Sequence, residues 1–149
     1  MMMKSRTLFF ITAGLLILGI ATFIFSTRDQ EAVQVFPATV DRDCAPWDGG
    51  AFTVKIPMSD GTAIDISIWQ SPQIKSPVVF SFPDDSGQVG NAILIHPVGL
   101  PDPLTGTVYF WNVNQEDPVE GRFELRTESG KVFKGQFKAE WGNFIALCG

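Results

Sequence analysis

The sequence predicts an all-β domain, an antiparallel barrel or sandwich of about eight strands, preceded by one N-terminal transmembrane helix. Apolar and polar residues alternate with a period of two in most runs after Cys44. Clusters of Gly, Pro, Asp and Ser separate these runs at short spacing, as turns do. A single uncharged apolar run lies near the N-terminus, at residues 8–25.

The N-terminal run, "LFFITAGLLILGIATFIF", has 18 residues, which is just long enough to cross a bilayer as a helix. Lys4 and Arg6 precede it, so the N-terminus should stay in the cytoplasm and the rest of the chain should be exported. Large residues occupy the positions where a cleavage site requires small ones. We therefore interpret residues 1–28 as an uncleaved signal anchor, with secretion after signal cleavage as the alternative.

The remainder divides into a juxtamembrane linker, residues 29–43, and one extracytoplasmic β domain, residues 44–149, on the periplasmic side or the cell surface. Residues 29–149 hold eight Lys and Arg against all 16 Asp and Glu, a difference of −8. Because nucleic-acid affinity depends on cationic side chains that displace counterions, nucleic acid is not expected as a partner.

The two cysteines, Cys44 and Cys148, are expected to form a disulfide, because both lie on the exported, oxidising side. With a single histidine they cannot supply the four ligands of a structural zinc site, and no C-x-x-C redox motif is present. Cys44 stands before the first expected strand and Cys148 ends the last one. The disulfide should therefore bring the first and last strands together.

The stretch "DRDCAPWDGG" around Cys44 is rich in acids but lacks the glycine at position six and the glutamate at position twelve of an EF-hand loop. We interpret it as an Asx- and Gly-rich turn, with Trp47 packed beside the cystine or capping the edge of the core. An irregular calcium site formed by Asp41, Asp43 and Asp48 is the alternative. No metal or cofactor is otherwise predicted.

Eight runs are expected to be strands. The run "TVYFWNV" is apolar on both faces and is typical of a central or doubly covered strand. Gly135 stands between two inward phenylalanines, where a missing side chain would let a neighbouring ring lie across the strand. The runs are residues 52–57, 63–69, 78–82, 91–95, 107–113, 121–127, 131–141 and 144–148.

The C-terminal part resembles a pattern in uncharacterised exported bacterial proteins. "GTVYFWNV", "VEGRFELRTESGKVFKGQFKAEW" and the closing "CG" carry the resemblance, which covers about residues 104–149. The pattern is a G-x-[FV]-x-[LV] strand, a Gly turn and a G-x-F-x-A strand before a terminal cysteine. It implies an antiparallel β domain on an exported chain and supplies no catalytic residues.

Catalytic chemistry is not predicted. His96 is the only histidine, it precedes a proline at the end of a run, and the G-x-S-x-G motif is absent. A binding surface is a better candidate, because Trp69 lies opposite the Ile face of its run and Tyr109 and Trp111 share one face of theirs. We take these three as candidate ligand-binding residues, with burial in a second hydrophobic layer as the alternative.

The sequence thus favours a non-enzymatic, membrane-anchored extracytoplasmic domain of the bacterial envelope that binds a protein partner or has a structural role. The alternative is a calycin-like or sandwich module that binds a glycan or a small apolar ligand.

Overall fold

The computed structural model describes residues 33–144 and 146–148, so the predicted transmembrane helix at residues 8–25 lies outside the described residues. Within the described part, no helix is long and apolar enough to span a membrane. Eight strands form one sheet. They are β1 (Val35–Cys44), β2 (Gly50–Pro57), β3 (Ala63–Ile68), β4 (Val78–Phe82), β5 (Gly90–Ile95), β6 (Asp102–Asn112), β7 (Val119–Thr127) and β8 (Val132–Trp141).

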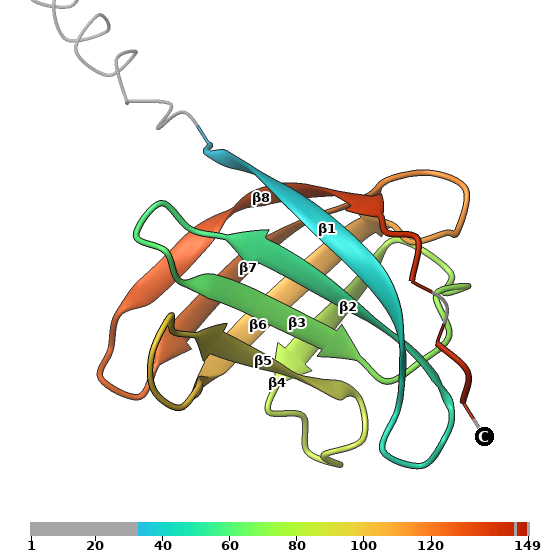
Figure 1. The fold of residues 1–149 in the computed structure, drawn as a ribbon, viewed down its shortest axis with the longest axis horizontal. Coiled ribbons are helices and arrows are strands. Elements are labelled where there is room, and N and C mark those ends of the chain that lie inside the picture. Colours follow the sequence, from blue (N-terminus) through green and yellow to red (C-terminus); the bar gives the residue numbers. More distant parts are fainter. Residues whose placement is uncertain (1–32, 145, 149) are drawn as a thin grey trace, which may run out of the picture. The chain divides into compact units, whose positions relative to one another are not determined.

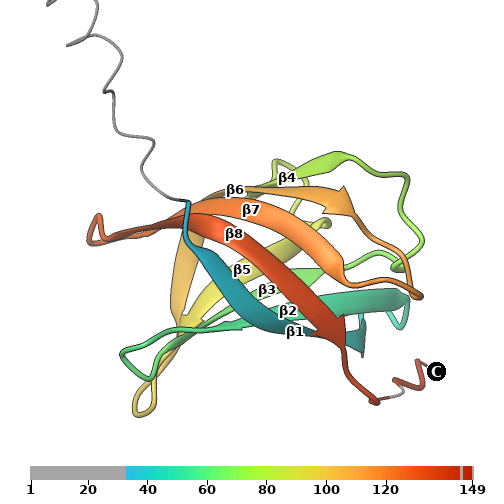
Figure 2. The ribbon, with the colours of Figure 1, turned by 90° about the horizontal axis from the view of Figure 1, so that it is seen from above.

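The sheet closes into a barrel (Figures 1 and 2). The strands β6, β5, β3, β2, β1, β8 and β7 follow one another, and the pairing of β7 with β6 completes the ring. The short strand β4 pairs with residues 106–110 of β6, whereas β5 pairs with residues 102–103 of the same strand. β4 is therefore an additional strand that does not belong to the ring. The expected all-β fold of about eight strands is confirmed, and the architecture is a barrel rather than a sandwich.

The barrel is mixed rather than purely antiparallel, because β1 and β8 pair in parallel. Residues 35–43, which were expected to belong to the linker, instead form most of this strand. The side chains of Phe36, Ala38 and Val40 point into the barrel and are buried. Pro37 lies between Phe36 and Ala38 on the outer face and is exposed to solvent.

The last expected strand is not formed. β8 ends at Trp141, and the described residues 142–144 and 146–148 belong to no strand. Both edges of β8 are already paired, one with β7 and the other with β1. An additional strand would have no free neighbour on β8, so the apolar residues near the C-terminus remain outside the sheet.

The interior of the barrel is filled by side chains from every strand. Phe110 lies at its centre and makes edge-to-face contacts with Phe52, Phe80 and Phe137, with ring centroids 5.6–5.8 Å apart. Such contacts add to the free energy gained by burying the rings. β6 is a central strand paired on both edges, which is one of the two expected alternatives; its outer face is only partly covered. The largest fully buried side chains are Phe52, Phe110, Phe137, Ile56, Ile64, Ile66, Ile68, Leu125, Val40, Val54, Val108 and Val119.

Gly135 has the role expected from the sequence. A methyl group at its Cα would lie 2.5 Å from Cε2 of Phe36, which is too close for two carbon atoms. The ring of Phe36 therefore lies across the backbone of β8 at this point, and it also contacts Phe123 at 5.7 Å between centroids. The missing side chain on β8 thus allows β1 to pack tightly against the last strand.

The two ends of the barrel differ in what they carry. β1 is antiparallel to β2, so it begins beside the β2–β3 turn, at the same end as the β5–β6 loop and the β7–β8 turn. We call this the entry end. The opposite end carries the β1–β2, β3–β4 and β6–β7 loops and the segment after β8. We call it the cystine end, because it holds the disulfide.

The disulfide between Cys44 and Cys148 is present, with the two Cα atoms 5.5 Å apart. It joins the last residue of β1 to the segment that follows β8, across 104 residues of sequence. The expectation that the two cysteines hold the ends of the domain together is confirmed. The link reinforces the only parallel pair of the barrel.

Removing the disulfide should destabilise the barrel strongly. We expect the Cys44→Ser/Cys148→Ser variant to lose about 2–5 kcal/mol in free energy of unfolding, because the unfolded chain regains the entropy of a long open loop. Urea unfolding followed by Trp fluorescence measures the difference. Reductant should lower the midpoint of the parent protein and leave the variant unchanged; a variant as stable as the oxidised parent would contradict the assignment.

Candidate binding surfaces

Two of the three predicted ligand-binding residues lie together on the outer face of the barrel. The rings of Tyr109 and Trp111, both on β6, are 6.0 Å apart at 68°. Tyr109 stands directly opposite Val79 of β4 and Arg122 of β7. The guanidinium of Arg122 lies 5.2 Å from the centroid of the Tyr109 ring, a cation–π contact. We call Val79, Tyr109, Trp111 and Arg122 the β6 patch.

The β6 patch is exposed to solvent both on β4 and on β6. Val79 is 55 % exposed and Trp111 is 39 % exposed. Arg122 was not among the predicted site residues, and neither was Val79. Only the strand register brings them beside Tyr109, and that register cannot be inferred from alternation within each strand.

Trp69, the third predicted residue, belongs to a different cluster. It follows the last residue of β3, and its ring contacts Trp47 edge to face, 5.7 Å between centroids. The ring contacts within the described residues include none between Trp69 and the β6 patch. We call Trp47 and Trp69 the tryptophan pair.

Trp47 is presented on a constrained turn rather than buried against the core, and it is 52 % exposed. The N–H of Ala45 donates to the carbonyl of Gly49 (2.8 Å), and Asp48 adopts a left-handed conformation with φ of 63°. A methyl group at Gly49 would lie 2.9 Å from Nε1 of Trp47, so the indole lies over this glycine. The turn holds the ring in a defined position at the cystine end.

Trp141 shows what a structural tryptophan looks like in this barrel. Its Nε1 donates to the carbonyl oxygens of Asn114 (2.8 Å) and Asp117 (3.1 Å), and the guanidinium of Arg42 lies 5.7 Å from its ring centroid. It holds the β6–β7 loop against the end of β8. The indole N–H groups of the other three tryptophans donate to no acceptor among the described residues. These three are Trp47, Trp69 and Trp111.

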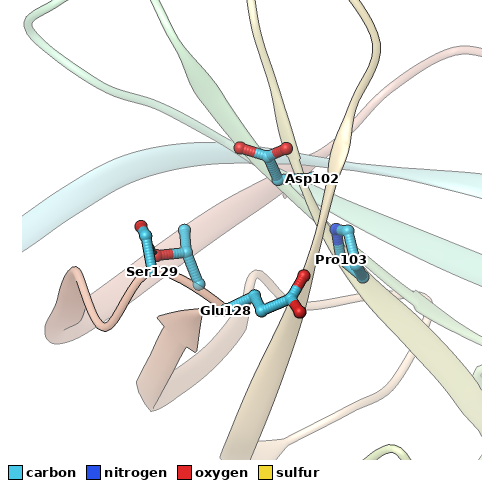
Figure 3. A pocket seen from close by; sticks show the side chains of 5 residues that line it. Asp102, Pro103, Glu128 and Ser129 are labelled. Atoms are coloured by element: carbon cyan, nitrogen blue, oxygen red, sulfur yellow. Dashed lines mark hydrogen bonds between the residues drawn. The ribbon is translucent and has the colours of Figure 1, made fainter.

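His96 lies at the entry end, where its Nε2 is 3.0 Å from Oδ2 of Asp102. Asp102 also borders an open pocket of about 350 Å³, together with Pro103 on β6 and Glu128 and Ser129 of the β7–β8 turn (Figure 3). The hydroxyl of Ser129 forms a hydrogen bond with that of Thr127 (2.8 Å) and not with His96. The Asp102 carboxylate is half exposed. Among the described residues, no serine hydroxyl forms the hydrogen bond to His96 that a serine nucleophile would need.

Two of the three acids of the alternative calcium site, Asp41 and Asp43, have other partners. Oδ2 of Asp41 forms an ion pair with Nζ of Lys55 (3.2 Å), and Asp43 accepts hydrogen bonds from the N–H of Cys44 and the hydroxyl of Thr53. Among the residues that the structure describes, no group of three or more His, Cys, Asp or Glu side chains could hold a metal ion. These acids organise the start of the β1–β2 loop.

A polar row crosses the outer face of β2 and β3 beside this loop. Thr53, only 5 % exposed, donates its hydroxyl to Asp43 (3.0 Å), so the Ser67 hydroxyl, 2.9 Å away, is left to donate to Thr53. Two residues further, Asp65 stands between Lys55 on β2 and Ile93 on β5. Partial burial raises the pKa of the Asp65 carboxyl, and the nearby Lys55 ammonium offsets part of that shift.

The fold and its surfaces define a class of protein: a small closed mixed barrel, held by one disulfide, with aromatic side chains exposed on its outer face and at one end. Comparison with models of known families, with curated proteins and with solved structures finds no match. The function must therefore be argued from the residues of this chain.

Replacing Asp65 by Asn should stabilise the barrel at pH 7. Because the pKa of Asp65 is higher in the folded state, the ionised carboxylate destabilises the fold above that pKa, and the penalty disappears as pH falls below the unfolded value near 3.8. The gain should shrink accordingly between neutral and acid pH. Urea midpoints across this range measure it, and Asp85→Asn, on an exposed loop, controls for net charge. A gain that does not depend on pH would refute this explanation.

Proposed function

We propose that the chain is a non-enzymatic, membrane-anchored extracytoplasmic β-barrel that binds a protein partner through the β6 patch. The anchor is argued from the sequence of residues 8–25 and its basic flank. The partner is argued from the surface of the barrel. The observation that carries the proposal is the exposed Tyr–Trp–Arg cluster on the outside of a barrel whose interior is filled.

Because the interior of the barrel is filled, we argue for binding at its outer surface. Calycin-like barrels hold small ligands inside, in a cavity lined by inward side chains. Here the inward positions are occupied by Phe, Ile, Leu and Val side chains that pack against one another at the centre. An apolar ligand would have to displace several of them, because a close-packed interior has little free volume to hold it. Recognition at the surface requires no such rearrangement.

The composition of the β6 patch is that of a protein interface. Trp, Tyr and Arg are the residues that most often carry binding energy when a partner covers them. Tyr109 and Trp111 are rigid and present apolar surface with a polar end, and Arg122 stacks on Tyr109 while its charge remains available for a carboxylate. Val79 extends the apolar surface onto β4. The four residues come from three adjacent strands, so the surface is preformed.

Site-specific photocrosslinking tests this interface. A photoreactive side chain at position 79 of the full chain, in the cells that produce it, should give a discrete protein adduct. The same group at position 132 is a matched control, because Val132 is also a strand valine, 50 % exposed against 55 % for Val79. Trp111→Ala should reduce the adduct at position 79 about 30-fold if truncation costs 2 kcal/mol, as for a typical hot spot.

Trp111 lies on the outer face, so the Trp111→Ala variant should keep the melting temperature of the parent, which separates lost binding from lost folding. Equal adducts from positions 79 and 132, or an adduct unaffected by Trp111→Ala, would overturn the assignment of the β6 patch.

A glycan-binding role is the second candidate, and the tryptophan pair favours it. The C–H groups of a sugar ring carry partial positive charge and pack on the negative face of an indole. Trp47 offers such a face on a rigid turn, and its N–H and that of Trp69 are available to hydroxyl groups. The neighbouring side chains Asp48, Gln70 and Ser71 are exposed and polar. The pair therefore combines a stacking surface with hydrogen-bonding groups.

Titration with a panel of oligosaccharides, followed by Trp fluorescence, distinguishes this role from the first. A saturable change in fluorescence that is lost in Trp47→Ala and retained in Trp111→Ala would place a glycan on the tryptophan pair. The reverse pattern would place it on the β6 patch, and the absence of any saturable change across the panel would exclude this second role.

A further inference from the structure

The β5–β6 loop at the entry end exposes two large apolar side chains almost completely. Val98 is 90 % exposed and Leu100 is 86 % exposed. They lie in the segment "HPVGLP", residues 96–101, between Pro97 and Pro101. Gly99, between them, has φ of 112°, a conformation open to glycine but strained for other residues. The two side chains therefore stand on a loop whose backbone is restricted by two prolines.

The base of this loop is closed by a specific contact. His96 follows β5 and Asp102 begins β6. Their side chains form a hydrogen bond across the base of the loop, with 3.0 Å between Nε2 and Oδ2. Just beyond, Leu94 pairs with Asp102 in the ladder. These contacts hold the two ends of the loop together, and the loop projects from them. Val98 and Leu100 are not among the residues packed against the barrel core. Apolar side chains held away from the core in this way are typical of an interaction site.

The position of the loop relative to the chain suggests what covers it. The loop lies at the entry end, where β1 begins at Val35. Only nine residues, 26–34, separate Val35 from the apolar run that we propose spans the membrane. Nine residues reach about 30 Å at most when fully extended. A barrel anchored by this segment therefore has its entry end within reach of the bilayer surface.

We propose that residues 96–101 dock on the lipid bilayer, with Val98 and Leu100 inserted at the boundary between headgroups and acyl chains. This inference rests on the proposed membrane anchor. Short apolar segments bind at this depth through the area they bury. The acids near the loop, Asp60, Asp102 and Glu128, outnumber the cations, and Lys131 is already paired with Asp60 at 3.6 Å. Docking should therefore be driven by apolar contact and should not require anionic lipids.

The test uses the full chain reconstituted in phosphatidylcholine vesicles. Val98→Cys adds a single free thiol, because both native cysteines are in the disulfide. An environment-sensitive fluorophore on this thiol should emit as in an apolar medium, and lipids brominated on the upper acyl chain should quench it. The matched control is the same fluorophore on Glu116→Cys, in the exposed β6–β7 loop at the cystine end, which should remain unquenched. Adding Leu100→Asp to Val98→Cys should bring quenching down to the control level.

The outcomes separate this inference from the anchor beneath it. If alkaline carbonate removes the chain from the vesicles, the proposed anchor fails and the docking fails with it. If the chain stays in the vesicles but the fluorophore at position 98 is no more quenched than at position 116, the docking alone is overturned. Quenching that appears only when phosphatidylglycerol is added would also overturn it, since docking would then depend on charge. Quenching at position 98 alone, unchanged by Leu100→Asp, would overturn insertion of the loop.

Discussion

The parallel pairing of β1 with β8 is the constraint on which the rest of the structure depends. It joins the first and last strands of the domain, so β1 and β8 each gain a neighbour on the edge that would otherwise be open. The chain entropy lost in bringing together segments about 100 residues apart must be offset locally. Three contacts supply this at β1: the ring of Phe36 over Gly135, the pairing of Ala38 with Ala139, and the disulfide of Cys44.

The sequence predicts β2 to β8 well and β1 poorly, for a physical reason. From β2 onward, most strands alternate clearly and are bounded by turn residues, and most neighbours in sequence are also neighbours in the sheet. In β1, acids occupy the half that approaches the cystine. Its parallel partner is distant in sequence, so no hairpin signal marks the pair. The opposite error, an extra strand at residues 144–148, came from apolar residues that follow β8, both edges of which are occupied.

The candidate surfaces show the same division between local and distant information. Tyr109 and Trp111 are two residues apart on one strand, so alternation alone places them on one face. Arg122 and Val79 join them through the registers of β7 and β4, which no local pattern encodes. Trp69 was assigned to the same surface by alternation, but it lies one residue beyond the end of β3. There the chain leaves β3, the N–H of Trp69 donates to the carbonyl of Val89, and the ring of Trp69 contacts Trp47.

The two ends of the barrel expose different apolar side chains. The entry end exposes the aliphatic residues Val98 and Leu100, whereas the cystine end carries the tryptophan pair together with the exposed Phe144 and Leu147, and Trp111 lies near it. Between the two ends stands a filled core closed into a ring of strands, which resists deformation because close-packed interiors have little free volume. A contact at one end is therefore poorly placed to alter the other by changing the interior. What such a barrel can do is fix geometry: with its aliphatic loop on the bilayer, it would hold the aromatic surfaces at a set height and orientation above the membrane, where a partner or a glycan meets them.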